Sequence, residues 1–87
     1  MKIEIKNHNP YQSLIDVVRE LTKDENGYEF IRTYILLIKT GTLGEDTIIM
    51  TPDGDDYRFD YDWWEGGDVE LLGIMPFDDV VVPRNIK

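Results

Sequence analysis

Eight carboxylates crowd the stretch from residue 53 to residue 70, which begins DGDDYRFDYDWWEGG, and Arg58 is its only basic side chain. Carboxylates in such numbers could perform acid–base catalysis, bind a divalent cation or present a negatively charged surface to another protein. The rest of the sequence favours the third of these roles. The eight acids, called the acidic segment below, are Asp53, Asp55, Asp56, Asp60, Asp62, Glu65, Asp68 and Glu70.

Catalysis and metal binding lack the residues that they normally need. Ser13 is the only serine, His8 is the only histidine, and cysteine is absent, so no nucleophile and base form a recognisable set. The glycine pairs carry neither the phosphate-binding fingerprint nor its lysine. The turn at residues 53–56 lacks the alternating acids and the distant glutamate of an EF-hand. We therefore expect neither an enzyme nor a bound metal or other cofactor.

The net charge of −9 is unevenly distributed along the chain. Residues 1–39 hold six acidic and six basic side chains, whereas residues 40–87 hold twelve acidic and three basic ones. Such a field repels nucleic acid and anionic lipid and attracts basic protein surfaces. The longest apolar run, residues 34–38, is too short to cross a bilayer, and no secretion signal is evident. We expect a cytoplasmic protein whose partner has a basic surface.

Hydrophobic periodicity predicts a single α+β domain over residues 1–87, with an antiparallel sheet of four or five strands packed against one N-terminal helix. Asn9 is a suitable helix cap, and Pro10 suits the first helical position. A stripe of apolar residues at helical spacing follows, and Asn26-Gly27 supplies a stop. The helix is therefore predicted over residues 10–24.

Turn residues divide the remaining chain into predicted strands. The segment 28–39 fits a helical face as well, but its β-branched and aromatic residues favour a central strand buried on both faces. The order of the strands in the sheet is not set by these signals. The predicted strands cover residues 1–6, 28–39, 46–51, 57–64 and 69–75, with a further edge strand at 80–82.

The predicted strand at 57–64 separates its aromatic residues from its acids, because successive side chains point to opposite faces. Acids two residues apart would lie about 6.6–6.8 Å apart on one face, a spacing that resembles a phosphate backbone. A plainer interpretation is a solvated face that deters aggregation. The aromatic face would hold Tyr57, Phe59, Tyr61 and Trp63, and the other face Asp56, Arg58, Asp60, Asp62 and Trp64.

Trp64 falls on the acidic side of this strand by parity. An exposed tryptophan surrounded by charge is typical of an interface hot spot. The alternative is that its ring folds over the turn formed by Gly66-Gly67. The sequence leaves both interpretations open.

The C-terminal stretch YRFDYDWWEGGDVELLGIMPFDDV resembles a pattern in small proteins of unknown function from phages and other bacterial mobile elements. The resemblance covers about a quarter of the chain and brings no catalytic residues. It implies a mobile-element setting, in which small acidic proteins often inhibit host machinery, as anti-CRISPR proteins and DNA mimics do. The matching residues are Tyr57, Phe59, Asp62-Trp63-Trp64-Glu65-Gly66, Asp68-Val69-Glu70, Leu72-Gly73, Pro76 and Asp79-Val80.

Two functional hypotheses follow. In the first, the protein is a non-enzymatic nucleic-acid mimic from a phage or mobile element. It binds a basic nucleic-acid-binding site on a host protein, such as a CRISPR-type defence nuclease complex, through the acidic segment and Trp64. In the second, it is a structural or accessory phage interaction domain whose acidity serves solubility. Either could be a monomer or a homodimer.

Overall fold

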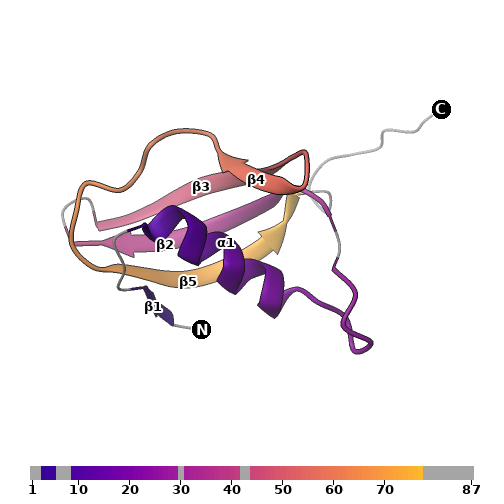
Figure 1. Cartoon of the computed structure of the whole chain (residues 1–87). Coiled ribbons are helices and arrows are strands. Elements are labelled where there is room, and N and C mark those ends of the chain that lie inside the picture. The colour runs from indigo at the N-terminus through magenta and orange to yellow at the C-terminus, as the bar shows by residue number, and fades with distance from the viewer. Residues whose placement is uncertain (1–2, 6–8, 30, 42–43, 78–87) are drawn as a thin grey trace.

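The computed structural model of the chain describes residues 3–5, 9–29, 31–41 and 44–77. Within these ranges, one helix and five strands follow one another along the chain (Figure 1). The predicted α+β class, with an antiparallel sheet and a helix near the N-terminus, is confirmed. The elements are β1 (Ile3–Ile5), α1 (Pro10–Leu21), β2 (Tyr34–Thr40), β3 (Gly44–Asp53), β4 (Asp56–Phe59) and β5 (Val69–Pro76).

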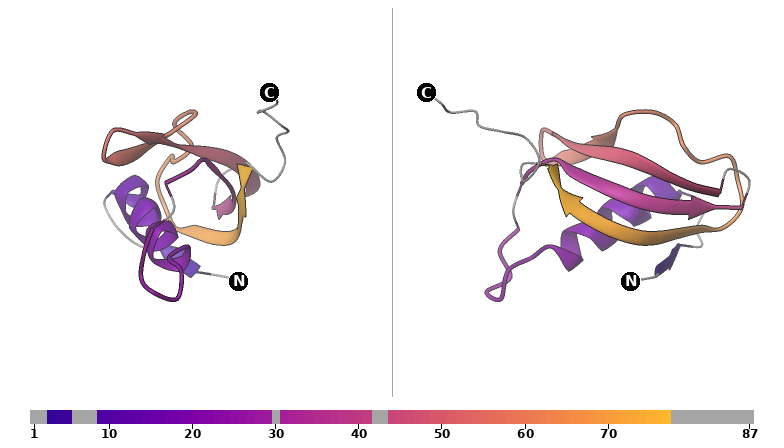
Figure 2. Two further views of the ribbon diagram at one scale, coloured as in Figure 1. Left: turned by 90° about the vertical axis from the view of Figure 1, so that its right-hand side faces the viewer. Right: turned by 180° about the vertical axis from the view of Figure 1, so that it is seen from behind.

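The strands form one sheet in the order β1-β5-β2-β3-β4, with every neighbouring pair antiparallel. β2 is central and pairs along its whole length with β3 and β5. The sheet is curled, and α1 lies against its inner face (Figure 2). The strands predicted at 46–51 and 69–75 are present and slightly longer, as β3 and β5. The edge strand expected at 80–82 lies outside the described residues.

The start of α1 follows the local signals in the sequence. The Oδ1 atom of Asn9 accepts a hydrogen bond from the backbone N–H of Gln12 at 3.3 Å, and Pro10 occupies the first turn. This cap satisfies one of the backbone donors that a helix leaves free at its beginning. The apolar stripe then faces the sheet and buries Pro10, Leu14, Ile15 and Val18.

The end of α1 differs from the prediction. The helix stops at Leu21 rather than at residue 24. Beyond it, the Asp24 carboxylate accepts hydrogen bonds from the backbone N–H groups of Asn26 and Tyr28, at 2.8 and 2.9 Å. A side chain that binds nearby amides in this way competes with helical hydrogen bonding. The resulting turn also postpones the next strand, so β2 begins at Tyr34 rather than at residue 28.

The strand interpretation of the segment 28–39 is confirmed for β2, but burial on both faces is wrong. One face of β2 packs into the core, while Leu37 is 37% exposed on the other. The side chains alternate as in any strand, and α1 covers only the inner face of the sheet. The buried residues of β2 are Tyr34, Leu36, Ile38 and Thr40.

β4 is shorter than the predicted strand at 57–64 and ends at Phe59. The Asp60 N–H still donates to the Ile49 carbonyl at 3.1 Å, but the Ile49 N–H donates to the Asp60 side chain, at 3.2 Å. Because a carboxylate takes the place of the next strand carbonyl, regular pairing stops here. The predicted row of acids along one strand face is therefore wrong, since Asp60 and Asp62 lie in the loop after β4.

The core lies between α1 and the inner face of the sheet. Trp63 is only 1% exposed, and its ring centroid lies 4.8 Å from that of Tyr11 and 5.6 Å from that of Phe59. Tyr57 and Phe59 also pack against the core, as predicted, whereas Tyr61 is 40% exposed. The buried hydrophobic cluster contains Ile5, Leu14, Ile15, Val18, Tyr34, Leu36, Ile38, Ile48, Met50, Trp63, Val69 and Leu71.

Candidate partner-binding surface

The acidic segment runs from one end of the sheet to the other. It begins at the turn between β3 and β4, follows β4, and passes along the flank of the molecule in the loop that leads to β5 (Figure 1). The charges are thus spread along a flank instead of being stacked on one strand. Asp53, Asp55 and Asp56 lie at one end, Asp60, Asp62 and Glu65 in the connecting loop, and Asp68 and Glu70 at the other end.

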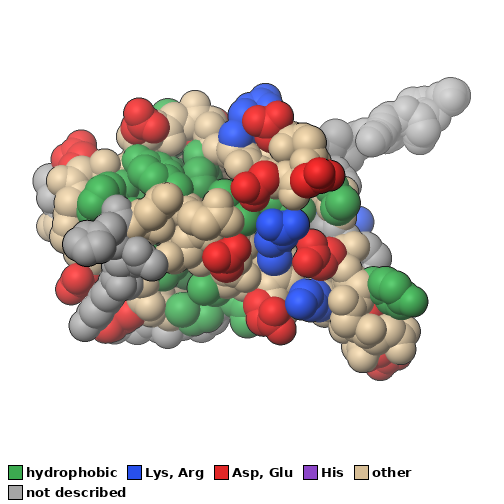
Figure 3. All heavy atoms as spheres, in the orientation of Figure 1, with side chains coloured by type: hydrophobic (Ala, Val, Ile, Leu, Met, Phe, Trp, Pro, Cys, Tyr) green, Lys and Arg blue, Asp and Glu red, His purple; other side chains and the backbone are tan. Residues whose placement is uncertain are grey.

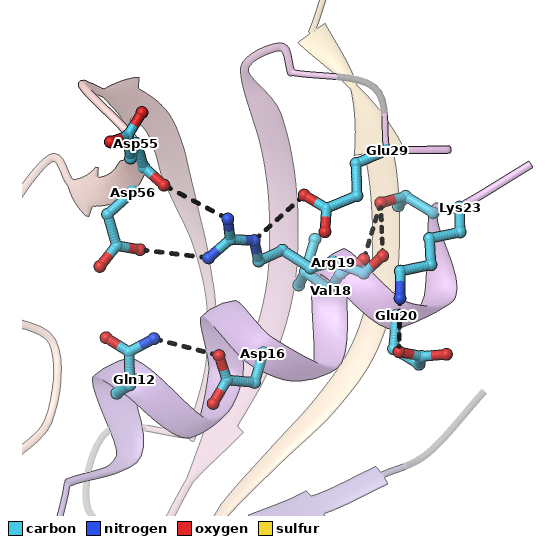
Figure 4. Close-up of polar contacts among 10 residues, drawn as sticks. Gln12, Asp16, Val18, Arg19, Glu20, Lys23, Glu29, Asp55 and Asp56 are labelled. Atoms are coloured by element: carbon cyan, nitrogen blue, oxygen red, sulfur yellow. Dashed lines mark hydrogen bonds and ion pairs between the residues drawn. The ribbon is translucent and has the colours of Figure 1, made fainter. Parts of the chain in front are cut away.

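At the β3–β4 end, Arg19 of α1 reaches into the acidic segment (Figure 4). Its Nη2 donates to the Asp55 carbonyl oxygen at 3.2 Å, and its Nη1 lies 3.7 Å from Asp56 Oδ1. Its Nε donates to Glu29 Oε1 at 3.3 Å, and this hydrogen bond raises the pKa of Arg19 above its ordinary value. The guanidinium also lies over the ring of Tyr57, 5.9 Å from its centroid. Asp56 is therefore already paired within the chain.

Acidic and basic side chains are interspersed around this contact. On the face that carries α1, side chains of both signs lie close together (Figure 3). Lys23 Nζ is 3.1 Å from Glu20 Oε1, and Asp16 accepts a hydrogen bond from the Gln12 side chain at 3.0 Å. The α1 face therefore does not present a continuous negative surface, and sequence reasoning missed this arrangement. The sequence gives little indication of the contact between Arg19 and Asp55, because the two residues are 36 positions apart.

Two acids protect the free edge of β3 beyond the end of β4. Asp60 caps the Ile49 N–H, and Asp46 Oδ1 accepts from the Thr47 N–H at 2.8 Å. The Tyr61 hydroxyl donates to the other oxygen of Asp46. Partial burial, and then this hydrogen bond, raise the pKa of Tyr61 to about 12. Capped amides cannot pair with a strand of another molecule, so these groups guard the edge against aggregation.

Trp64 adopts the second of the two positions expected from the sequence, folded over the glycine turn. Its Nε1 donates to the Gly67 carbonyl at 3.1 Å, and its backbone N–H donates to the Tyr11 hydroxyl at 3.2 Å. Gly66 and Gly67 have φ values of 106° and 90°, which side chains disfavour. The Trp64 backbone therefore fastens the acidic loop to Tyr11 of α1, while its half-buried ring holds the glycine turn and lies edge-on to the Tyr11 ring.

At the β5 end, three acids and one lysine surround a shallow hollow of about 220 Å³. Glu70 lies directly across from Glu4 on one side and from Lys39 on the other. Glu4 was not predicted, because its pairing with β5 joins distant parts of the chain. The hollow is lined by Glu4, Lys39, Thr40, Gly41, Asp68 and Glu70.

Once these contacts are assigned, the carboxylates of five acids of the segment have no partner among the described residues. The side chains of Asp53, Asp55, Asp62, Glu65 and Asp68 are exposed and form no ion pair or hydrogen bond with a described residue, since Arg19 contacts only the backbone carbonyl of Asp55. Among the described residues, no three His, Cys, Asp or Glu side chains could together hold a metal ion. Ser13 lies in α1, and His8 lies outside the described residues. The arrangement is suited to electrostatic attraction of a basic surface.

Comparison with known proteins gives no match: no family model fits the sequence, and neither the curated proteins nor the solved structures include a similar chain. In the described part of the chain, no helix is both long and apolar enough to span a membrane. Functional interpretation therefore depends on the surface itself.

Proposed function

We propose that this protein is a non-enzymatic binder of basic, nucleic-acid-binding surfaces on other proteins. The observation that carries the proposal is the set of exposed acids whose carboxylates have no partner among the described residues, Asp53, Asp55, Asp62, Glu65 and Asp68. They lie along the path of the acidic segment from the β3–β4 turn to the beginning of β5 (Figure 1). A basic groove that normally holds phosphates would meet negative charge over a comparable length.

The physical basis of this function is charge steering. Unpaired carboxylates of one sign disfavour folding, and at physiological salt their field extends about 8–10 Å before it is largely screened. They raise the rate of encounter with a positive partner and contribute less to the lifetime of the complex. Asp56 and Asp60 contribute charge but also have structural partners, and Trp64 holds the loop. The binding role is therefore concentrated in the five acids whose carboxylates have no partner among the described residues.

The setting proposed for this activity is a phage or mobile element, and the proposed target is a defence nuclease complex of the bacterial host. This part of the proposal rests on the resemblance of residues 57–80 to small acidic phage proteins. An accessory interaction domain is the second candidate, and the exposed apolar face of the sheet at Leu37 and Met75 favours it. Binding through that face would be insensitive to salt.

The test compares two charge reversals in the tagged full-length chain. Asp62→Lys with Glu65→Lys changes the acidic loop, and Glu20→Lys with Glu25→Lys changes the net charge by the same amount on the α1 side. Each protein is used to capture partners from bacterial lysate at low and high salt, with and without competing DNA. We expect capture of a nucleic-acid-binding protein by the wild type and the control, and its loss with the loop variant, high salt or DNA. Equal capture by both variants would refute the proposal.

A further inference from the structure

The outer face of the sheet, opposite α1, carries an uncovered apolar strip. This face looks toward the viewer in the right-hand panel of Figure 2, with α1 behind it. Leu37 and Met75 are 37% and 45% exposed there. A hollow of about 360 Å³ opens beside them, lined by Ile35, Leu37, Thr47, Gly73, Ile74 and Met75.

The pairing register arranges the strip in two adjacent rows across β5, β2 and β3. One row is large throughout and contains Met75, Ile35 and Ile49. The next row, two residues further along the strands, contains Gly73, Leu37 and Thr47. Gly73 leaves space in the second row because it has no side chain. The two rows are therefore complementary in size, large against small.

We propose that a second copy of this chain packs on this face, related by a two-fold axis that lies between the sheets and perpendicular to the strands. The axis passes at the level of Leu36, which is opposite both Ile48 and Ile74. Each large row then meets the small row of the other copy. Met75 enters the space over Gly73 of the second copy, and the arrangement is self-complementary, as a two-fold interface requires.

The same axis also matches the charges at the ends of the strip. Arg58 is paired with Thr51, three residues beyond Ile48 along β3, and Glu45 lies three residues before Ile48. Rotation about the axis exchanges these two levels, so Arg58 of each copy reaches the level of Glu45 of the other, one strand to the side. Neighbouring strands are about 4.8 Å apart, a distance that the long arginine side chain can cross. Both side chains are exposed, and neither has an ion pair or hydrogen bond with a described residue. This complementarity selects a second copy as the occupant.

The size of the strip sets the expected strength of the dimer. Ten residues of β3 span about 30 Å and three strands about 14 Å, so the outer face, with the strip at its centre, offers each copy at most about 400 Å². The total of about 800 Å² is below the usual size of stable interfaces, so the dimer is weak and reversible. Pairing through the β3 edge is blocked, since Asp60 and Asp46 cap its amides.

The test is sedimentation velocity on the full-length chain from about 5 µM to about 500 µM, a range wide enough to follow the dissociation of a weak, reversible dimer. The wild type should form a dimer at the upper concentrations. Met75→Lys should remain monomeric. Leu21→Lys, which also replaces an exposed apolar residue by lysine but on α1, should dimerise as the wild type does. Circular dichroism establishes that each variant is folded.

Charge exchange identifies the axis. Arg58→Glu and Glu45→Arg should each weaken dimerisation at least tenfold, because like charges then meet, and the double variant should recover it. A wild type that is monomeric at every concentration would overturn the proposal. The proposal would also be overturned if Met75→Lys left dimerisation unchanged, or if the double variant dimerised no more strongly than the single variants.

Discussion

Replacing Arg19 by methionine tests whether one side chain fastens α1 to the rest of the fold. Arg19 reaches Glu29 in the loop after α1 and the Asp55 carbonyl in the β3–β4 turn (Figure 4). Its guanidinium also lies over the ring of Tyr57 in β4. Methionine retains much of the aliphatic stem but removes the guanidinium. The loss therefore measures the polar contacts rather than the packing.

The magnitude follows from the exposure and geometry of each contact. The Arg19 side chain is 31% exposed, so its ion pairs with Glu29 and Asp56 contribute about 0.5 kcal/mol each. The hydrogen bond to the Asp55 carbonyl contributes about 1 kcal/mol, and the contact with Tyr57 about 0.5 kcal/mol. Arg19→Met should lower the free energy of unfolding by about 2.5 kcal/mol.

Urea unfolding and thermal unfolding measure this change. A loss of about 2.5 kcal/mol lowers the Tm of a domain of this size by roughly 10–20 °C. Arg19→Lys keeps the charge but not the planar guanidinium. It should therefore lower the free energy of unfolding by about half as much as Arg19→Met does. Lys23→Met is the matched control, because Lys23 pairs only with Glu20 among the described residues and should cost less than about 0.5 kcal/mol. If Arg19→Met were no more destabilising than Lys23→Met, the reasoning would be wrong.

Two further predictions concern the protected edge of β3. The pKa of Tyr61 is about 12 in the folded protein and about 10 in the unfolded chain. The protonated hydroxyl therefore stabilises the fold fully below pH 10, and this stabilisation is lost as the pH rises through 12. In the Tyr61→Phe variant, the free energy of unfolding, measured by urea titration, should fall less steeply between pH 10 and pH 12 than in the wild type. An unchanged dependence on pH would contradict the prediction. Asp60→Ala should accelerate amide hydrogen exchange at Ile49 severalfold, whereas Asp60→Asn, which keeps an oxygen acceptor, should not. Equal exchange in the two variants would show that the cap is unimportant.

The parts of the fold that were predicted correctly depend on local signals. The Asn9 cap and the apolar stripe define the start and the face of α1, and the turns divide the later strands. The errors in element boundaries have a common cause. Asp24 and Asp60 each bind a backbone amide with a carboxylate, ending α1 early in one case and β4 in the other. Aspartate has several such options, and tertiary context selects among them.

The candidate surface was predicted in composition but not in arrangement. The sequence identifies every acid of the segment, yet it does not show which acids have partners. Asp56 is paired by Arg19 from α1, and Glu70 lies beside Glu4 from β1. Both contacts join distant parts of the chain, so neither periodicity nor spacing could indicate them. The acids without partners are identified only after these contacts are assigned.

The two proposals are linked by symmetry but fail separately. A two-fold axis perpendicular to the strands keeps the β4 side of both copies on the same side of the dimer, so two acidic flanks would lie next to each other. A single basic partner could then contact both, which raises its effective affinity. Salt screens the repulsion between the flanks, but it also screens the Arg58–Glu45 pairs, so dimerisation should respond less to salt than partner binding does. This difference in salt response separates the two interactions, and Met75→Lys should reduce partner binding only if the dimer is the form that binds.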